Sequence, residues 1–374
     1  MSIVITGERG LLGRHMSFYL GSLPTYRDRI VALDRASFND KEALISALAT
    51  ATAVIHCAGV NRGEDADVEQ GNIALAEQLL DGLKVAEVNP HVVYMNSTHK
   101  VFDSPYARGK RAAHDLLDAW AAQDTQRKYT EMVLPHVFGE GGRPFYNSAF
   151  HTFCYQLAQD EQLSVNGRGQ LELLHAQDIA QATVAAIERC TQGEVRLAGH
   201  KMSVASAAGK LTDFSDSYRG DVIPDLRNRL DLQMFNTMRS FLYPSFYPRR
   251  LKLNVDERGA LFEAVKNRNG GQAFLSTTRP GITRGDHYHF NKVERFLVVK
   301  GEAIIKIRAL GEEKVETFRV SGSEPAYVDM PTLHTHNITN VGDDELMTLF
   351  WSHEIFDPDN PDTFFERVES TEGQ

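Results

Sequence analysis

The arrangement of apolar residues changes once along the chain, and this change sets what the chain can fold into. Over about the first 240 residues, short apolar runs alternate with segments of helical periodicity, a pattern typical of βαβ units with a parallel sheet. After the aromatic and proline-rich segment 243–248, short β-rich segments follow one another, separated by glycines and prolines. That spacing predicts an all-β sandwich or barrel. We therefore expect an α/β domain over residues 1–245 and an all-β domain over residues 246–374.

The individual elements follow from the same pattern. The strands expected in the first domain are Ile3–Thr6, Ile30–Leu33, Val54–Cys57, Val92–Asn96, Glu131–Leu134 and Glu194–Leu197, and examples of its helices are Ala74–Leu83, Lys110–Ala122 and Ile179–Arg189. The strands expected in the second domain are Lys252–Val255, Gln272–Thr278, Arg295–Val299, Ala303–Arg308, Lys314–Val320, Ala326–Val328 and Leu346–Trp351.

Composition excludes several classes of protein. The 374 residues are 42% hydrophobic and 24% charged, which suits a soluble protein with a core in each of two domains. A net charge of −10 argues against a broad nucleic-acid surface. No apolar run approaches the ~20 residues of a membrane span, and the N-terminus opens on a strand rather than a signal peptide. Three cysteines without a Cys-x-x-Cys pair predict a reduced, cytoplasmic protein.

A glycine-rich loop follows the first expected strand and opens a helix. The segment 6–13 is Thr-Gly-Glu-Arg-Gly-Leu-Leu-Gly. In this strand–turn–helix setting, two glycines allow a tight turn close to a pyrophosphate, and the third allows close helix packing. The N-terminus of the helix offers free N–H groups to the phosphates. The segment predicts dinucleotide binding by Gly7, Gly10, Leu11, Leu12 and Gly13. The alternative is that the turn is rich in glycine for folding reasons alone.

Two neighbouring residues give opposite indications about the dinucleotide. Asp34 ends the second expected strand, where a carboxylate accepts hydrogen bonds from the ribose 2′-hydroxyl of NAD. Arg35 follows it, and an arginine there can hold the 2′-phosphate of NADP. A solvated strand end is the other interpretation of Asp34. These two residues leave NADH and NADPH both open as the cofactor.

A Tyr-x-x-x-Lys pair follows the fourth expected strand. Tyr106 and Lys110 share one helix face, and a lysine there is expected to lower the pKa of the phenol so that it can exchange a proton during hydride transfer. The strand before it ends in Ser97 and Thr98, whose hydroxyls can bond the same substrate oxygen. The alternative is a partly buried tyrosine beside a solvated lysine.

These features resemble the extended short-chain dehydrogenase/reductase family, which acts on nucleotide sugars, over residues 1 to about 240. The turn His56-Cys57-Ala58-Gly59, Asn72 on the next helix and Leu134–Gly139 belong to the match. The resemblance makes Thr98 the catalytic hydroxyl, with Ser97 as the fallback, and places Ala58, Gly59 and Asn72 beside the cofactor. His136 replaces an asparagine of the family. The acid pair of the family's 4,6-dehydratases is replaced by His99-Lys100, which favours reduction or epimerisation over dehydration.

The second domain carries a set of metal-ligand residues. Its spacing is Gly-x5-His-x-His-x4-Glu-x6-Gly from Gly281 to Gly301, and a later segment, 331–340, contains further histidines. Histidine nitrogens and a carboxylate form a set suited to a divalent metal. Both segments resemble the motifs of the cupin family, although Leu333 stands where glycine is usual and His334 is an extra histidine. The expected ligands are His287, His289, Glu294 and His336; a histidine-rich barrel without metal is the alternative.

The segments 256–263 and 284–287 also resemble the metal-free dTDP-4-keto-6-deoxysugar epimerases, in which the corresponding histidine abstracts a proton. His287 is therefore left open as ligand or base. Either role serves the removal and return of a proton beside a ketone, which a metal assists by polarising the ketone.

Over its full length the chain resembles bifunctional capsular-polysaccharide enzymes that form UDP-2-acetamido-2,6-dideoxy-β-L-talose. The matching segments include Ala58–Arg62, Tyr146–Ser148, Thr152–Tyr155, Phe296–Val299 and Phe356–Thr363. The resemblance implies a Rossmann-type reductase domain followed by a cupin, that is, a double-stranded β-helix. It also implies NADPH, zinc, a homodimer and a UDP-4-keto-6-deoxy-sugar that is epimerised at C3 and reduced at C4. Asn147, Arg168 and Arg284 are the expected substrate contacts, and a solvated Arg168 is an equal alternative.

Two other functions stay open. One is a 4-ketosugar reductase whose cupin is only structural. The other is a cofactor-sensing regulator with no activity, although a sensor has no need of the proton-transfer set Thr98, Tyr106 and Lys110.

Overall fold

The structure, a computed structural model, describes residues 1–165, 169–268 and 270–369. The chain forms two compact units. Unit 1 contains residues 1–149 and 167–204, and unit 2 contains residues 150–166 and 205–374. None of the described helices combines the length and the apolar character that crossing a bilayer needs.

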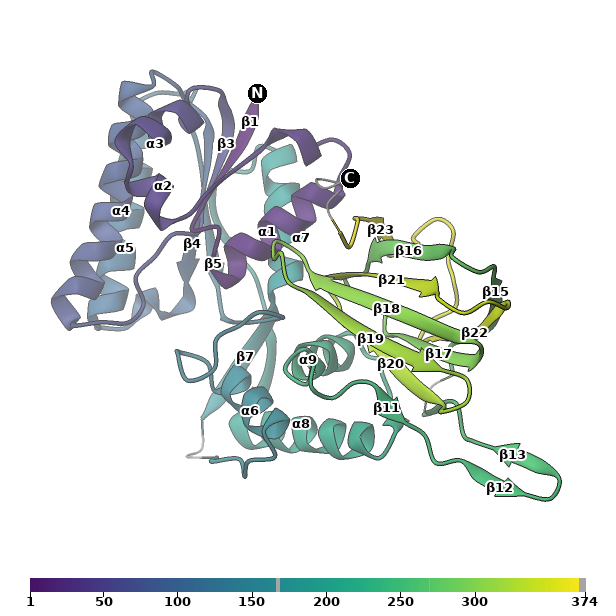
Figure 1. Ribbon diagram of the computed structural model, residues 1–374. Helices are drawn as coiled ribbons and strands as arrows, with labels where there is room; N and C mark the ends of the chain where they lie inside the picture. The colour runs from purple at the N-terminus through teal and green to yellow at the C-terminus, as the bar shows by residue number, and fades with distance from the viewer. Residues whose placement is uncertain (166–168, 269, 370–374) are drawn as a thin grey trace. The chain divides into compact units, whose positions relative to one another are not determined.

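Unit 1 is built on a parallel sheet with helices on both faces (Figure 1). The strand order is β2-β1-β3-β4-β5-β8, so the chain reverses its direction of travel across the sheet between β1 and β3. Ligands of such sheets bind at the carboxyl ends of the strands beside this reversal. The strands are β1 (Ser2–Thr6), β2 (Ile30–Leu33), β3 (Ala51–His56), β4 (His91–Ser97), β5 (Lys128–Leu134) and β8 (Gly193–Arg196).

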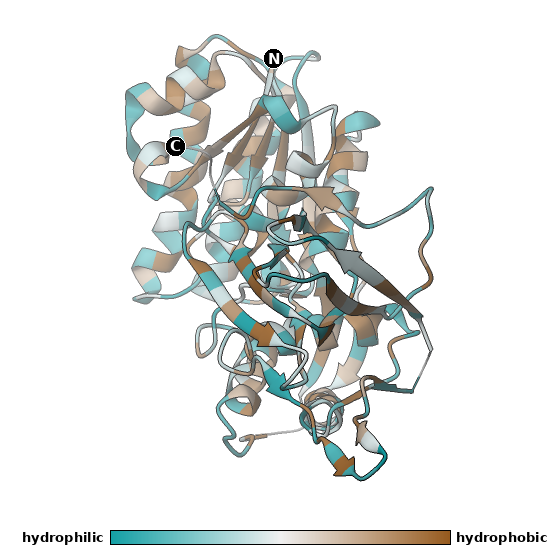
Figure 2. Ribbon diagram, turned by 45° about the vertical axis from the view of Figure 1, so that its right-hand side comes forward, coloured by the Kyte–Doolittle hydropathy of each residue, from teal (hydrophilic) through white to brown (hydrophobic). Residues whose placement is uncertain are grey.

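Alternate residues of the strands feed two separate cores. On β1, Ile3 and Ile5 pack with α1 and α7, whereas Val4 packs with α3, α4 and α5. Because both faces are covered, the strands are nearly continuous runs of apolar residues, and in Figure 2 they are largely brown. The helices are α1 (Leu11–Ser22), α2 (Arg35–Asn39), α3 (Lys41–Leu48), α4 (Asp65–Val85), α5 (Pro105–Ala122) and α7 (Ala176–Glu188). Unit 1 also contains the short helices η1 (Arg27–Arg29) and η2 (Thr98–Val101), and a small sheet of β6 (His136–Phe138), β7 (Gln170–His175) and β9 (His200–Ser203).

Unit 2 contains two five-stranded antiparallel sheets. Phe296 and Phe350 of one sheet share an apolar core with Ile305, Ile307 and Ile338 of the other. The first sheet has β11 (Arg249–Arg250), β20 (Ala326–Met330), β17 (Glu294–Lys300), β22 (Leu346–Ser352) and β15 (Gln272–Thr278). The second has β19 (Val315–Ser321), β18 (Glu302–Ala309), β21 (His334–Asn340), β16 (Thr283–Tyr288) and β23 (Phe364–Phe365). The remaining elements of unit 2 are α6 (Ala149–Ala158), α8 (Val204–Arg219), α9 (Arg229–Ser240), the hairpin β12 (Asn254–Asp256) and β13 (Gly259–Leu261), and the pair β10 (Val222–Ile223) and β14 (Lys266–Asn267).

Helices α8 and α9 are fastened to the β sheets of unit 2 by buried polar contacts. Arg295 and Asp329 form an ion pair of 2.7 Å, with side chains 1% and 0% exposed. From α8, the Tyr218 hydroxyl donates to Asp329 at 2.7 Å, and from α9, Arg239 donates to the carbonyl oxygen of Met330 at 2.7 Å. A buried ion pair needs such added hydrogen bonds to offset its desolvation. These contacts explain why α8 and α9 belong to the same compact unit as the β sheets. The expected boundary at 245–246 instead separates the α/β part of the sequence from the all-β part.

The predicted fold class is confirmed: an α/β parallel-sheet domain precedes an all-β domain of antiparallel sheets. Strands Ile30–Leu33 and Gln272–Thr278 have the predicted bounds. The list of expected strands omitted β16 and β21, which carry histidine, threonine and asparagine where apolar residues are usual in a strand. His287 of β16 and His336 of β21 belong to the candidate site described next, and the polar residues around them hide the apolar alternation that marks a strand.

Candidate functional site

The glycine-rich loop forms a cradle at the carboxyl end of β1. Gly7 has a φ of +70°, and a Cβ at this position would lie 2.8 Å from the backbone nitrogen of Ala58. A Cβ on Gly13 would lie 2.2 Å from the carbonyl oxygen of Gly7. Gly10 is the N-cap of α1 and makes no side-chain cap, so the first turn keeps free N–H groups, and Leu11 and Leu12 are the first residues of that turn. The loop therefore fits the diphosphate of a dinucleotide.

The turn after β3 closes the other side of this cradle. The Thr6 hydroxyl pairs with Nδ1 of His56 at 2.8 Å and accepts the backbone N–H of Ala58 at 3.2 Å. Asn72 donates to the carbonyl oxygen of Val60 at 2.6 Å and accepts the N–H of Val60 at 3.2 Å. The amide of Asn72 is thus used to hold the turn that carries Ala58 and Gly59. Burial lowers the pKa of His56 to about 3, so this ring is neutral.

Asp34 lies at the start of α2, directly after β2. Its carboxylate caps that helix by accepting the N–H of Ser37 at 2.9 Å, and it lies 3.1 Å from the guanidinium of Arg9. The side chain of Arg9 is 80% exposed. The sequence analysis did not include Arg9; the available signal was a charged residue inside a loop otherwise made of glycine and leucine. Arg9 and Arg35 therefore both stand beside the one carboxylate expected to contact the ribose.

Tyr106, Lys110 and Ser97 come together at the start of α5. Burial raises the pKa of Tyr106, and a hydrogen bond with the Ser97 side chain lowers it part of the way. Lys110 donates to the carbonyl oxygen of Met95 at 2.6 Å and lies over the ring of Tyr94. Burial lowers the pKa of Lys110 to about 7. The expectation that Lys110 lowers the pKa of Tyr106 is wrong for this structure, because burial dominates both groups.

Ser97, rather than Thr98, is the hydroxyl that contacts Tyr106. Ser97 is the last residue of β4 and also accepts the N–H of His99 at 3.1 Å. Thr98 begins η2, and no hydrogen bond joins it to Tyr106 within the part of the chain that the structure describes. The fallback residue of the sequence analysis is therefore the one placed at the phenol.

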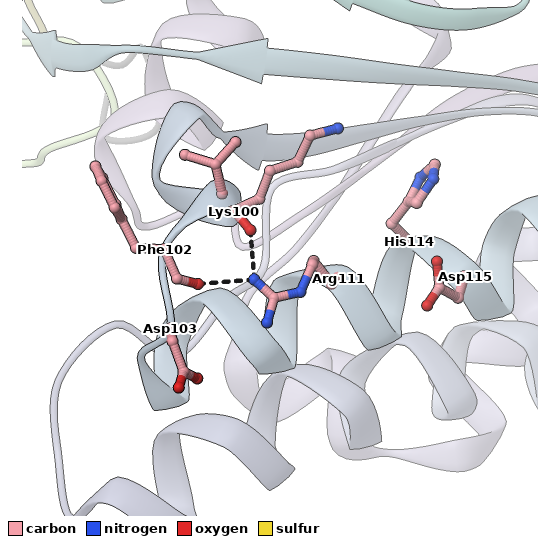
Figure 3. Close-up of a pocket in the computed structure, with 7 residues that line it drawn as sticks. Lys100, Phe102, Asp103, Arg111, His114 and Asp115 are labelled. Carbon is pink, nitrogen blue, oxygen red and sulfur yellow. Dashed lines mark hydrogen bonds between the residues drawn. The ribbon is translucent and has the colours of Figure 1, made fainter.

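A hollow of about 540 Å³ lies beside η2 (Figure 3). The residues that line it hold the loop after Ser97. Arg111 extends from α5 and donates to the carbonyl oxygens of Lys100 and Phe102, at 2.5 and 2.8 Å. Lys100 in turn contacts the buried carboxylate of Glu131 on β5 at 2.7 Å. The cationic groups of this hollow are thus committed to the protein itself, and they fix η2 against α5 and β5. We therefore interpret the residues of this hollow as structural supports and do not assign the hollow as a ligand-binding site.

Of the expected substrate contacts in this part of the chain, Asn147 can be placed, and so can the neighbouring His136. Asn147 donates to the carbonyl oxygen of Asn61 at 2.8 Å and is exposed. His136 pairs with the hydroxyl of Ser148 at 2.9 Å, and burial lowers its pKa to about 4. Arg168 lies outside the described residues.

Arg62, which was not among the expected site residues, donates to the carbonyl oxygens of Phe145 and Tyr146 and lies over the Tyr146 ring. It therefore holds the segment before Asn147.

In unit 2, the four expected ligands converge. Their ligand atoms all lie within 4.8 Å of one another. His287 of β16 is paired with His336 of β21, Glu294 begins β17, and His289 follows β16. Oε2 of Glu294 lies 3.1 Å from Nε2 of His289, 3.4 Å from Nε2 of His336 and 3.9 Å from Nε2 of His287.

This donor set fits a divalent metal. Nε2 of His336 is buried and makes no hydrogen bond of good geometry among the described groups. Burial lowers the pKa of His336 to about 4, so at neutral pH its nitrogen carries a lone pair that can bind a metal. Burial alone would raise the pKa of Glu294, but the three histidines around its carboxylate outweigh this effect and hold the pKa well below its usual value. Three nitrogens and one carboxylate oxygen match the sets that bind zinc and related ions.

His334, the extra histidine of the second motif, and Arg284, an expected substrate contact, do not join the cluster. His334 packs against the ring of Tyr243, and its Nδ1 pairs with the carbonyl oxygen of Thr332 at 2.8 Å. Arg284 bonds the hydroxyl of Thr278 at 3.0 Å and is exposed. Leu333, in place of the usual glycine, adopts a left-handed φ of 59° while buried.

Comparison with known proteins agrees with this two-part description. The sequence model of the NAD dependent epimerase/dehydratase family matches residues 3–202. The chain belongs to the NAD dependent epimerase/dehydratase family. A second model, of the polysaccharide biosynthesis C-terminal domain, matches residues 254–364.

Two relatives match the epimerase/dehydratase part and the β part together. UDP-2-acetamido-2,6-beta-L-arabino-hexul-4-ose reductase of Pseudomonas aeruginosa is 29% identical over 369 residues, 97% of this chain and 98% of the relative. The crystal structure of capsular polysaccharide assembling protein CapF from Staphylococcus aureus is 32% identical, covers 98% of this chain and 100% of its own, and has a TM-score of 0.63. The full-length resemblance to capsular-polysaccharide enzymes is thereby confirmed.

A shorter relative matches part of the chain. Spore coat polysaccharide biosynthesis protein SpsL of Bacillus subtilis is 23% identical over 124 residues, which is 30% of this chain and 82% of the relative.

Proposed function

We propose that this chain reduces the C4 ketone of a UDP-4-keto-6-deoxy-N-acetylhexosamine with NAD(P)H. The observation that carries the proposal is the grouping of Ser97, Tyr106 and Lys110 beside the glycine cradle of β1. The full-length likeness to a UDP-4-ketosugar reductase supplies the substrate class. A proton-transfer group next to a dinucleotide cradle has no purpose in a regulator that only senses its cofactor.

The residues of unit 1 have distinct parts in this reduction. When bound in the cradle, the reduced nicotinamide supplies the hydride. Tyr106 donates its phenol proton to the C4 oxygen, and Ser97 stabilises the phenolate that remains. Lys110 keeps a positive charge within the site for part of its population at neutral pH, because its pKa is about 7. Thr98 keeps the position of the family's catalytic hydroxyl and is proposed to bind the sugar oxygen.

The dinucleotide preference rests on the group around Asp34. Arg9 neutralises this carboxylate at 3.1 Å, and Arg35 adjoins it. Two guanidinium groups favour a 2′-phosphate, so we propose NADPH, with NADH as the second choice.

We further propose that unit 2 epimerises C3 of the same 4-ketosugar before reduction, giving UDP-2-acetamido-2,6-dideoxy-β-L-talose or a close relative. His287, His289, Glu294 and His336 would hold zinc or a similar ion, which polarises the C4 ketone and so acidifies the proton at C3. The side chain of His287 is 24% exposed and that of His336 is 0% exposed, so His287 stands at the open side of the cluster. A base in place of a ligand at His287 is the alternative.

Three further proposals come with this function. We propose a homodimer, as the resemblance to the capsular-polysaccharide enzymes implies, and a cytoplasmic location, as the cysteine content predicts. The domains of function are residues 1–245 for reduction and 246–374 for epimerisation. A purely structural cupin is the second candidate, favoured if the metal cluster stays empty in the purified protein.

The reductase proposal is tested by replacing the proton donor. Tyr106→Phe should lower NADPH turnover with the 4-ketosugar about 10²–10⁴-fold while leaving NADPH binding unchanged. Tyr19→Phe, in α1, is the matched control and should keep full turnover. Undiminished turnover in Tyr106→Phe would overturn the proposal.

The same assay separates the two hydroxyls. Ser97→Ala should shift the pH profile of turnover upward, because Ser97 lowers the pKa of Tyr106. Thr98→Val should lower turnover without that shift.

The epimerase proposal is tested in the full-length Tyr106→Phe variant, which retains the cluster. In deuterated water its metal-loaded form should exchange the C3 proton of the 4-ketosugar, and the chelator-treated form should not. Equal absence of exchange in both forms would favour a structural cupin.

A further inference from the structure

The segment 361–368, which we call the clasp, runs beside the strand that carries the first metal-ligand histidine. Its strand β23 pairs with β16, placing Phe365 opposite His287 and Phe364 opposite Tyr288. The N–H of Glu366 donates to the carbonyl oxygen of Asp286 at 3.0 Å, and the N–H of Val368 donates to its carboxylate at 3.2 Å. The clasp therefore covers the edge of β16 that β21 does not pair with.

One residue of the clasp holds the turn between two ligands. The carboxylate of Asp362 accepts the backbone N–H groups of Phe290 at 3.0 Å, Asn291 at 2.8 Å and Lys292 at 2.8 Å. These three residues lie between His289 and Glu294. The buried ammonium of Lys292 also donates to the carbonyl oxygen of Pro361 at 2.7 Å, so the turn and the clasp are joined in both directions.

The backbone of the same residue orients a ligand. Nδ1 of His289 lies 2.6 Å from the carbonyl oxygen of Asp362, which can only accept. His289 must therefore carry a proton on Nδ1, which leaves Nε2, 3.1 Å from Oε2 of Glu294, as the nitrogen available to a metal. Partners of this kind fix the tautomer and the direction of a metal-bound imidazole.

We propose that Asp362 is a positioning residue for the metal. Its carbonyl sets the tautomer of His289, and its carboxylate sets the spacing of His289 and Glu294. The inference rests on the proposed metal site, and it adds a residue that follows Glu294 by 68 positions in the sequence.

The test uses the full-length protein stripped of metal by a chelator. Zinc is titrated against a chromophoric chelator of known affinity, and cobalt is added in a separate experiment to record the absorption spectrum of the site. Asp362→Asn should weaken zinc binding about 10–100-fold and change the cobalt spectrum, with unchanged circular dichroism of the metal-free form. Asp359→Asn, at an exposed position three residues earlier, is the control and should bind both ions like the parent protein.

Each result has one meaning. Parental zinc affinity and cobalt spectrum in Asp362→Asn would overturn the positioning role. A parent protein that binds neither ion would instead overturn the metal site itself. Should Asp362→Asn fail to fold, Asp362→Glu decides: it keeps the charge at a longer reach, and parental affinity and spectrum in that variant would overturn the inference.

Discussion

At the scale of single residues, burial has more effect on the proton-transfer site than the spacing of its residues. Tyr-x-x-x-Lys predicted that Tyr106 and Lys110 share a helix face, but their protonation depends on what packs around them. Lys110 is 5% exposed and lies under Gly59, where a Cβ would be 3.9 Å from its nitrogen. The residues that pack around Tyr106 and Lys110 come from β3, β4 and α4. The spacing of two residues within one helix contains no information about those other elements.

A pH dependence of stability follows from Lys110. Its pKa is about 7 in the folded chain and about 10.4 in an unfolded one. Between these values the unfolded chain binds the proton and the folded chain does not, so stability rises with pH, by up to about 1.4 kcal/mol per pH unit. Urea unfolding at pH 7 and pH 9 should show this gain in the parent protein, and Lys110→Met should reduce it. Lys84→Met, at the exposed end of α4, is the control and should keep the parental gain; an equal gain in Lys110→Met would contradict the argument.

At the scale of elements, the glycine-rich loop shows how much a local motif can predict. The pattern of 6–13 predicted strand, turn and helix in order, and the structure has β1, the loop and α1. Such a motif is predictable because every part of it lies within a few residues. The contact of Gly7 with Ala58 is not local, since the chain returns to it only after β2 and β3 have formed.

The two glycines of α1 provide a matched pair of substitutions. A Cβ on Gly13 would be 2.2 Å from the oxygen of Gly7, whereas a Cβ on Gly21 would meet only a side-chain atom of Ile30 at 3.9 Å. Gly13→Ala should cost about 1–3 kcal/mol of stability or more and abolish NADPH binding. Gly21→Ala should be neutral or stabilise by up to about 1 kcal/mol. Thermal unfolding and fluorescence titration with NADPH measure both; NADPH binding of parental strength in Gly13→Ala would contradict the assignment of the loop.

At the scale of the whole molecule, two kinds of prediction behaved differently. The proposed ligands His287, His289, Glu294 and His336 were predicted from their spacing together with its resemblance to the two cupin motifs, both of which lie within short stretches of sequence. The grouping of α8 and α9 with the β sheets was not, because it depends on single buried contacts such as Tyr218 with Asp329. No local sequence pattern distinguishes a tyrosine whose hydroxyl bonds a distant buried carboxylate from a tyrosine that makes only apolar contacts.

This grouping predicts how fragments behave. A fragment of residues 205–374 keeps Tyr218 and Arg239, whereas a fragment of residues 246–374 loses them and leaves polar atoms of Asp329 and Met330 without these donors. Loss of such partners at buried groups costs about 1–3 kcal/mol each. The longer fragment should therefore melt at a higher temperature in calorimetry, and a shorter fragment of equal or greater stability would show that α8 and α9 contribute nothing to the barrel.

The clasp also has a consequence for synthesis. The ribosome makes His287, His289 and Glu294 well before Asp362, by several seconds at ~5–20 residues per second. During that interval the turn 290–292 has no carboxylate to bind its N–H groups, and His289 has no carbonyl partner. If these residues bind a metal as proposed, a nascent chain emerges with three of the proposed ligands translated but not yet held in place, and binding of the ion would wait until the clasp has left the exit tunnel.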